Sequence, residues 1–397
     1  MLKKLYIEPT TKCNLNCKMC FRHSWFDEPI CDMEFEVFER ILATMPESVE
    51  TIFFGGMGEP LHHPRIMDML EMASATGRKV QLLTNGTLLS EEVITGLIER
   101  KLHTLWVSVD NLESTPGDPA EGHGFANKVL ENLNLFNTLR LRRESPIALG
   151  IAFVATKSNV HQLASLPRFI GYYMVKEVNI SNIYPSDSRA RDQMLYNRAL
   201  DSQESYGAAL ANLVTYNSMY VPAGTEELAG MVGGMDLRLY LDPKVSMPYF
   251  DMAVPEAAKG IVGMLADMNF RLFYNDEEIK RKINHCRFIK NGMCFVRSDG
   301  NVAPCMALLH NGSTFIGSKD RTIYYRSFGS IKKEGLEDIW NSHDYRAFRK
   351  KFDSFDFSPC IHCGHCELVE DNRQDCIGNE HPTCGACLWA EGVLSCP

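Results

Sequence analysis

The sequence lacks the features that mark a membrane protein, an exported protein or a nucleic-acid binder. It has no run of about 18 or more apolar residues, which argues against a transmembrane helix. The N-terminal stretch "MLKKLYIEPTTKC" has two lysines but not the apolar core of about 7–15 residues that a signal peptide needs. The net charge is −9 and no lysine- or arginine-rich run occurs, so nucleic acid is a poor candidate partner. These absences predict a cytoplasmic protein.

Cysteine is missing from positions 32 to 285, although the chain contains 14 cysteines. Four of them lie between 13 and 31, and ten lie between 286 and 396. This distribution divides the chain into an early site, a long cysteine-free body and a cysteine-dense tail. In a reducing compartment we expect such thiols to serve metal or redox chemistry and not to form disulfides.

The body alternates between apolar runs typical of strands and segments with helical apolar spacing. Strands are predicted at 4–9, 49–56, 79–86, 102–110, 146–156 and 175–185, and helices at 34–45, 64–77, 90–101, 125–142 and 160–174. Six such repeats are typical of a parallel sheet covered by helices, which right-handed crossovers curl into a full or partial barrel. The fold class is therefore α/β, and we expect this core over 1–190, followed by a helical connecting region over 191–280.

The stretch "TTKCNLNCKMCFRHSW" places Cys13, Cys17 and Cys20 directly after the first predicted strand. They therefore lie at the carboxyl ends of the strands, where barrels of this kind place their sites. A four-iron cluster is normally held by four thiolates, so three thiolates leave one iron open. The alternative is a zinc site in which His23 supplies the fourth ligand.

The spacing Cys-x₃-Cys-x₂-Cys after the first strand of a β/α body resembles the radical SAM superfamily. The resemblance implies that S-adenosylmethionine (SAM) chelates the open iron of a [4Fe-4S] cluster. One electron from the cluster then cleaves SAM and gives a 5′-deoxyadenosyl radical, which abstracts hydrogen from a substrate. The cofactor supplies the chemistry, and the protein orients and shields it. The sequence departs from the family at Met19, where an aromatic residue is common.

Polar and glycine residues at the ends of the next three strands resemble the SAM pocket of that family. "FFGGMGEP" (53–60) ends the second strand and resembles the glycine-rich motif that binds the methionine amino group, because glycine lets backbone approach a ligand closely. "LTNG" (83–86) and "SVD" (108–110) end the next two strands. The resemblance implies these SAM-binding residues: Gly55, Gly56, Gly58, Glu59, Asn85, Ser108 and Asp110.

The tail over 281–397 resembles the SPASM domain, an extension of radical SAM enzymes that typically holds two auxiliary four-iron clusters. The resemblance rests on a "DG-x-V-x-PC" hairpin, a helix predicted at 336–352 and a Cys-x₂-Cys run. It implies that Cys286, Cys294 and Cys305 begin one cluster and that Cys360, Cys363 and Cys366 begin the other. Each needs one further ligand, and four cysteines remain unassigned between them: Cys376, Cys384, Cys387 and Cys396. Zinc ribbons are the alternative for this region.

No catalytic acid or base follows from the sequence. Some SPASM enzymes carry an acidic residue directly after the cysteine of the "PC" motif, and this chain has Met306 there. The loop histidines receive no role: His23, His62, His63 and His310. Cys31 lies outside both cysteine patterns and is interpreted as a buried thiol.

The two ends of the chain, "KLYIEPTTKCNLNCKMCFRHSW" and "PTCGACLWAEGVLSCP", look like the maturases of tungsten-containing aldehyde oxidoreductases. The resemblance implies action on the pterin cofactor or the polypeptide of such an enzyme, with a low-potential reductant such as ferredoxin or flavodoxin as a further partner. The first alternative is an enzyme that modifies peptides or proteins. The second, of a different class, is an iron–sulfur electron carrier or a zinc scaffold.

Overall fold

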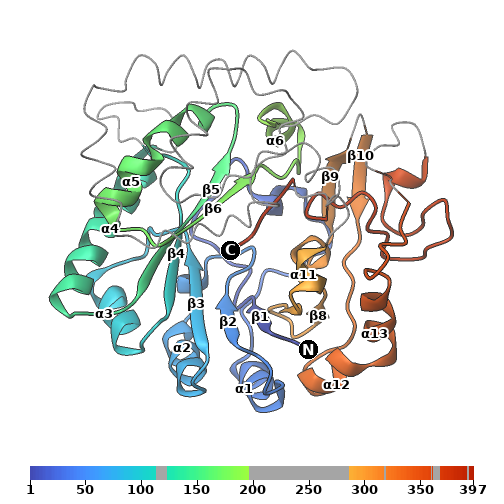
Figure 1. The fold of residues 1–397 in the computed structure, drawn as a ribbon, viewed down its shortest axis with the longest axis horizontal. Helices are drawn as coiled ribbons and strands as arrows, with labels where there is room; N and C mark the ends of the chain where they lie inside the picture. The colour runs from blue at the N-terminus through green and yellow to red at the C-terminus, as the bar shows by residue number, and fades with distance from the viewer. Residues whose placement is uncertain (113–122, 196–285, 317–318, 359, 361–366, 391–392) are drawn as a thin grey trace.

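The computed structural model describes residues 1–112, 123–195, 286–316, 319–358, 360, 367–390 and 393–397. Strands and helices alternate through the first half of the chain, as the sequence predicts (Figure 1). The elements are β1 (Lys4–Ile7), α1 (Phe35–Thr44), β2 (Thr51–Phe54), α2 (Ile66–Ala75), β3 (Lys79–Thr84), α3 (Glu91–Glu99), β4 (Thr104–Ser108), α4 (His123–Arg142), β5 (Ala148–Ala155), α5 (Leu166–Tyr173), β6 (Glu177–Asn182) and α6 (Ser188–Asp192). The helix predicted from 160 begins instead as a 3-10 turn, η3 (Val160–Ser165), and becomes α-helical only at Leu166.

The central sheet has eight strands in the order β6-β5-β4-β3-β2-β1-β7-β8. The first six strands are parallel to their neighbours, which confirms the predicted parallel α/β core. Among the described strands β6 pairs only with β5, so the sheet is an open, partial barrel. The other edge is extended from the tail, because β7 (Met293–Val296) pairs in parallel with β1 and β8 (Val302–Ala303) returns antiparallel to β7. The sheet is thus continuous across the predicted domain boundary at 281.

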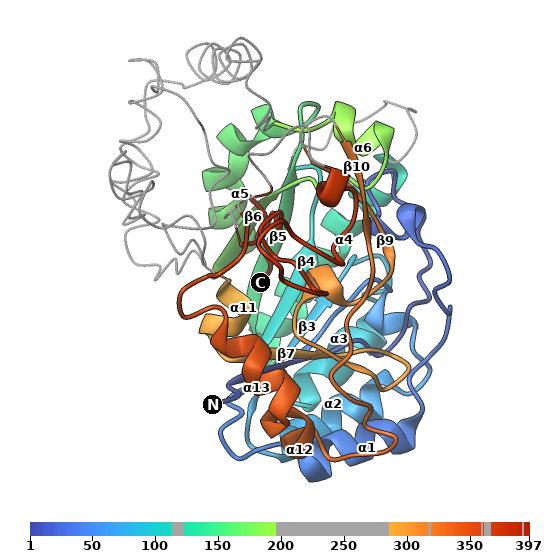
Figure 2. The ribbon, with the colours of Figure 1, turned by 90° about the vertical axis from the view of Figure 1, so that its right-hand side faces the viewer.

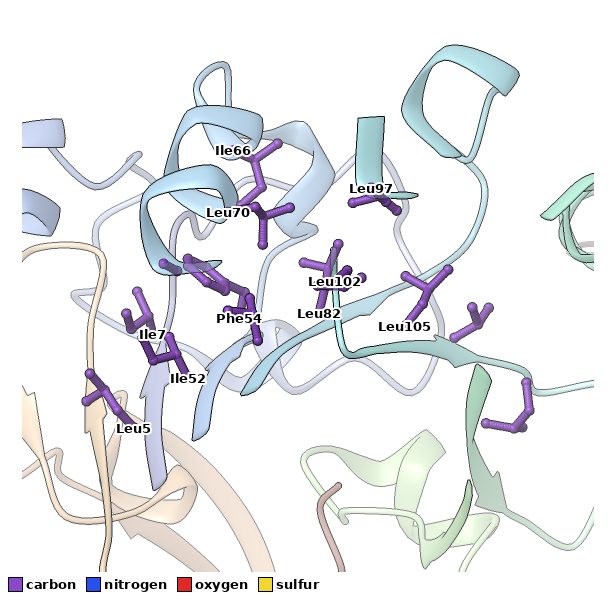
Figure 3. Packing of buried hydrophobic residues seen from close by; sticks show 14 of the residues in the cluster. Leu5, Ile7, Ile52, Phe54, Ile66, Leu70, Leu82, Leu97, Leu102 and Leu105 are labelled. Carbon is purple, nitrogen blue, oxygen red and sulfur yellow. The ribbon is translucent and has the colours of Figure 1, made fainter. Parts of the chain in front are cut away.

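The outer face of the sheet packs against the helices (Figure 3). Successive strand residues point to opposite faces, so Leu5 and Ile7 of β1 lie on the same side as Ile52 and Phe54 of β2. Helix residues such as Leu70 of α2 close this layer. All five side chains are fully buried, and each contributes roughly 1.5–3 kcal/mol relative to an exposed position. This packing holds the carboxyl ends of neighbouring strands level with one another.

The inner face of the sheet carries a second apolar layer that includes Tyr6, Phe53 and Trp106. The last part of the chain covers this layer, with Trp389 and Leu394 in the same cluster. We call residues 393–397 the crossing segment, because they run over the inner face from β6 to β1. At one end the side-chain amide of Asn182 donates to the carbonyl of Val393 (2.9 Å), and Ser395 Oγ donates to Asn179 (2.6 Å). At the other end Lys4 Nζ and the Tyr6 hydroxyl both donate to the Pro397 carbonyl.

The described part of the tail adds short elements beside the barrel, and in Figure 2 they extend from α12 at the bottom of the view to β9 and β10 near the top. They are α11 (Arg287–Lys290), β9 (Gly312–Ile316), β10 (Lys319–Ile323), α12 (Leu336–Asn341) and α13 (His343–Lys350), with 3-10 turns η4 (Met306–Leu308) and η6 (Glu367–Glu370). The single helix predicted at 336–352 is wrong. Ser342 has an extended backbone (φ −56°, ψ 151°) and its side chain accepts from the Tyr345 amide, so it ends α12 and caps α13.

The helical connecting region predicted at 191–280 lies, apart from its first five residues, outside the described residues. None of the helices in the described part of the chain combines the length and apolar character that crossing a bilayer requires.

Candidate functional site

The loop that carries the first three cysteines follows β1 and is closed by hydrogen bonds within itself. Arg22 donates to the carbonyls of Thr11 (3.0 Å) and Leu15 (3.1 Å), which pulls the two ends of the loop together. The amide of Cys20 donates to the carbonyl of Cys17 (3.0 Å), so the Cys-x₂-Cys pair forms a tight turn. The loop therefore presents its thiols from one short stretch of backbone.

Side chains from two other strand ends reach this loop. After β3, the Asn85 side-chain amide lies 3.9 Å from the Cys13 sulfur and donates to Asn14 (2.9 Å). After β4, Asp110 lies close enough to Cys17 to shift its ionisation. Partial desolvation in the loop raises the pKa of the Cys17 thiol to about 11, and the charge of Asp110 adds to the rise. The structure thus brings together the predicted residues from β1, β3 and β4.

The three thiols fit an open four-iron cluster better than a single zinc ion. Within the described residues no group of three His, Cys, Asp or Glu side chains is close enough to hold one metal ion. His23, the predicted fourth zinc ligand, instead places Nε2 2.9 Å from the Cys17 carbonyl. Three thiolates on one loop are the donor set that a cluster with one open iron requires. When bound, such a cluster supplies a low-potential electron and a coordination site for SAM.

The glycine-rich turn after β2 is shaped by close backbone contacts. At Gly58 an added Cβ would lie 2.2 Å from the carbonyl oxygen of Thr10 and 2.6 Å from that of Lys12. Gly56 has φ +131°, a conformation that other residues rarely adopt, and its Cβ position is filled by the side chain of Glu8. The turn is therefore pressed directly onto the start of the cysteine loop, which only glycine allows.

Glu59 ties this turn to the end of β3. Its Oε1 accepts from Thr84 Oγ1 (2.7 Å) and from the Leu61 amide (3.0 Å), and its Oε2 accepts from the Asn85 amide (2.7 Å). The side chain is buried, and that burial raises its pKa although these hydrogen bonds oppose the rise. Glu59 thus sets the position of Asn85. The contribution to SAM binding remains a prediction for all seven residues: Gly55, Gly56, Gly58, Glu59, Asn85, Ser108 and Asp110.

We expect Gly58→Ala to weaken SAM binding at least ~10-fold, about 1.4 kcal/mol, because the new methyl group would push the turn away from the cysteine loop. The measurement is the Kd for SAM by calorimetry on the reconstituted protein. Gly171→Ala in α5 is the matched control, since no atom lies within 4 Å of its Cβ position. Equal affinities of the two variants for SAM would contradict the role of the turn.

Four cysteines of the tail gather around one cavity: Cys286, Cys305, Cys384 and Cys387. Burial raises the pKa of the first three thiols, and in each case the charge of Cys387 adds to the shift, so Cys387 lies within electrostatic reach of each of them. The Cys387 amide donates to the Cys384 carbonyl (3.1 Å), the same tight turn as in the early loop. Four thiolates on one cavity are a complete set for a closed four-iron cluster.

Cys294 does not join this group. It lies on β7 in register with Leu5, and its side chain packs in the outer core, on the face opposite Phe295. Because strand residues alternate, a position on β7 that faces the helices cannot also face the cavity. Cys294 was included with Cys286 and Cys305 because the tail resembles the SPASM domain, and the cavity that Cys286 and Cys305 line also contains Cys384 and Cys387.

Cys360 and Cys376 form a second group, with Cys363 and Cys366 lying outside the described residues. The Ser358 hydroxyl lies 2.9 Å from the Cys376 sulfur, and the charge of Cys376 contributes to the raised pKa of Cys360. Arg321 is only 2% exposed, and burial lowers the pKa of its guanidinium. Cys360 of the second group and Cys384 and Cys387 of the first oppose that shift, so Arg321 is within electrostatic reach of both groups. A buried cation there would offset the negative charge of thiolate-bound clusters.

Cys396 lies in the crossing segment and accepts a hydrogen bond from Trp389 Nε1 (3.2 Å). Burial raises the pKa of its thiol, while Arg287 and Lys4 oppose the rise. Among the described thiols, the group around the first tail cavity has four members without Cys396. Cys31 is only partly buried, and its sulfur lies 3.4 Å from Ser298 Oγ, far along the chain in the tail.

A buried ionic network lies beside the glycine-rich turn, and no local motif in the sequence predicted it. The His310 ring lies between two carboxylates, with Nε2 2.9 Å from Glu8 and Nδ1 2.7 Å from Glu28. Arg297 also donates to Glu28 (2.9 Å). Burial alone would lower the pKa of His310, but the two carboxylates outweigh it and raise the pKa to about 9. Glu8 in turn accepts from the Met57 amide (3.0 Å), so the network connects the tail to the glycine-rich turn.

Two family models match the chain. The Radical SAM superfamily model matches residues 7–153, and the SPASM iron–sulfur cluster-binding domain model matches residues 286–367. The first match contains the early cysteine loop and the strand ends described above. The second contains the hairpin and the first cysteines of the tail.

Individual proteins are similar over different lengths. The tungsten-containing aldehyde ferredoxin oxidoreductase cofactor-modifying protein of Pyrococcus furiosus is 28% identical over 405 aligned positions, covering 100% of this chain and 97% of that protein. The PqqA peptide cyclase of Bradyrhizobium diazoefficiens is 24% identical over 161 residues, which is 40% of this chain and 41% of the relative. The crystal structure of SuiB from Streptococcus suis bound to precursor peptide SuiA has a TM-score of 0.55 at 19% identity, covering 92% of this chain and 70% of that one.

The matched models, the structural likeness and the cysteine loop at the strand ends agree. The chain belongs to the radical SAM superfamily, and its tail is a SPASM iron–sulfur cluster-binding domain.

Proposed function

We propose that this radical SAM enzyme modifies the cofactor of a tungsten-containing aldehyde oxidoreductase. The proposal rests on the share of this chain that is similar to each relative. The similarity to the P. furiosus cofactor-modifying protein extends over the whole chain, including the cysteine-rich tail, whereas the peptide cyclase matches less than half of it. The alternative substrate is the polypeptide chain of the oxidoreductase. A low-potential one-electron donor is the expected second partner, and we expect the reaction to take place in the cytoplasm.

The residues of the chain would divide the work as follows. Cys13, Cys17 and Cys20 would hold the cluster that leaves one iron open for SAM, and SAM bound there is the source of the 5′-deoxyadenosyl radical. Asn85 and Asp110, which lie close to these thiols, would line the SAM pocket. The apolar layer on the inner face of the sheet, closed by Trp389 and the crossing segment, would keep water from the reacting atoms.

The two tail groups would hold closed auxiliary clusters. We assign Cys286, Cys305, Cys384 and Cys387 to the first and Cys360, Cys363, Cys366 and Cys376 to the second. This assignment leaves Cys294, Cys396 and Cys31 without a metal. About twelve irons per chain are expected from three four-iron clusters, and Cys294→Ala should retain all of them.

The function is tested by SAM cleavage in an anaerobic, reconstituted sample. Dithionite plus SAM should release 5′-deoxyadenosine, and an oxidoreductase with its tungsten cofactor in the unmodified form should raise the rate and yield a cofactor of altered mass. No release of 5′-deoxyadenosine would contradict the enzyme itself. Release that responds to a peptide and not to the cofactor would replace the proposed substrate with a peptide.

A further inference from the structure

A cavity of about 570 Å³ opens beside α11 and α13, apart from the loop of the first three cysteines. Four of its lining side chains are cations, namely Lys290, Arg346, Arg349 and Lys350, against the single carboxylate of Asp353. We call this cavity the basic basin. Such a concentration of positive charge is unexpected on a chain whose net charge is −9, and like charges held close together repel one another.

Three of these cations have no side-chain partner among the residues that the structure describes. Lys290, Arg346 and Lys350 are exposed. No side-chain hydrogen bond or ion pair joins any of them to another residue in the part of the chain that the structure describes. Arg349 is held differently, with its guanidinium stacked 3.7 Å from the Trp340 ring. Within the described part of the chain, the basin therefore presents three cations without a side-chain partner around one fixed guanidinium.

The wall of the basin includes Cys286, which also lines the cavity of the first tail thiol group. Cys286 thus lies between the cavity of the first tail thiol group and the basic basin, and it contributes to the lining of both. Electron transfer between proteins requires the two redox centres to approach closely, and a ligand of one centre that lies at a charged surface provides such an approach. A site that only bound a small anion would not need a cysteine of this group in its wall.

We propose that the basic basin docks the acidic surface of a small one-electron carrier protein, which exchanges electrons with the auxiliary cluster held by Cys286. The carrier in its reduced form gives up one electron and is left oxidised by one electron, while the auxiliary cluster is reduced by one electron, and no bond is made or broken. The inference rests on the proposed function only in requiring that the enzyme cleaves SAM and holds that cluster. Complementary charge of this kind mainly accelerates association and weakens with salt.

The test compares two electron sources for the reconstituted holoenzyme. Dithionite is small and needs no docking site, whereas a reduced, acidic ferredoxin with two four-iron clusters does. The double variant Lys290→Glu/Arg346→Glu should raise the KM for the ferredoxin at least ~10-fold at low ionic strength and flatten its salt dependence. Its dithionite-driven release of 5′-deoxyadenosine should stay unchanged. The matched control is Arg142→Glu/Lys176→Glu, which changes the net charge equally at exposed positions outside the basin.

Each outcome decides the matter. A ferredoxin KM that is unchanged, or raised equally in the control variant, overturns the docking site. A basin variant that loses affinity for inorganic pyrophosphate, measured by calorimetry, but keeps its ferredoxin KM assigns the basin to a small anion and also overturns it. Failure of dithionite to drive SAM cleavage in the unchanged enzyme counts against the proposed function and is seen before any variant is compared.

Discussion

Replacing Cys17 with alanine should lower SAM cleavage at least ~10³-fold, the largest single effect that we expect in this protein. Cys17 lies in the middle of the early loop, and with only two thiolates left the cluster cannot be held. The variant should lose about four of its twelve irons. The measurements are 5′-deoxyadenosine release with dithionite and iron content per chain.

Two controls separate the early cluster from the tail. Cys384→Ala should also lose about four irons but still cleave SAM slowly, since its cluster is closed and does not bind SAM. Cys31→Ala, at a partly buried thiol in neither group, should keep both iron and cleavage. If folded Cys17 and Cys384 variants lost cleavage to the same extent, the division between an open and a closed cluster would be wrong.

His310→Gln should destabilise the enzyme by about 3 kcal/mol at pH 7. The pKa of His310 is raised from 6.5 to about 9 in the folded state, and each unit is worth about 1.4 kcal/mol. Because the folded pKa lies above the unfolded one, this stabilisation is fully present below about pH 6.5 and disappears as the pH rises through about 9. The side chain is 3% exposed, so solvent screens the interaction little.

The measurement is the difference in unfolding midpoint between the unchanged protein and the variant at several pH values, under anaerobic conditions. The difference should be large at pH 7 and small at pH 10. His343→Gln is the control, since that side chain is 92% exposed and its replacement should change neither value. The His310→Gln variant should also bind SAM more weakly, because without the His310 ring Glu8 would no longer be held against the Met57 amide. A midpoint difference that does not depend on pH would show that His310 is not charged in the folded protein.

Features encoded in neighbouring residues could be predicted from the sequence. The alternation of strands and helices follows from apolar periodicity, and the early cysteine loop follows from the spacing of Cys13, Cys17 and Cys20. The broken helix at Ser342 was also encoded locally, since an Asn-Ser pair that stops one helix and caps the next is visible in the sequence. It was missed because the apolar spacing continues across the break.

Features that depend on long-range packing could not be predicted. His310 and Glu8 are 302 positions apart, so nothing local marks them as partners. The grouping of Cys286 with Cys387 likewise depends on how the tail folds over the sheet, and the number of residues between two cysteines does not reveal which face of β7 Cys294 occupies. Which tail thiols share a cavity therefore depends on the tertiary structure, and their assignment to clusters remains a proposal.

The crossing segment connects the last residues of the chain to the first strand, so the inner face of the sheet can be covered only late in folding. The Tyr6 hydroxyl near the start of the chain is hydrogen-bonded to the Pro397 carbonyl, a sequence separation of 391 positions. Contacts between such distant residues form slowly, because the closure entropy of the loop must be overcome first. During synthesis, the barrel interior must therefore stay open until the residues that follow Cys384 and Cys387 have emerged. All four cysteines of the first tail thiol group therefore precede the crossing segment in the chain, and they are synthesised before that segment can cover the inner face of the sheet.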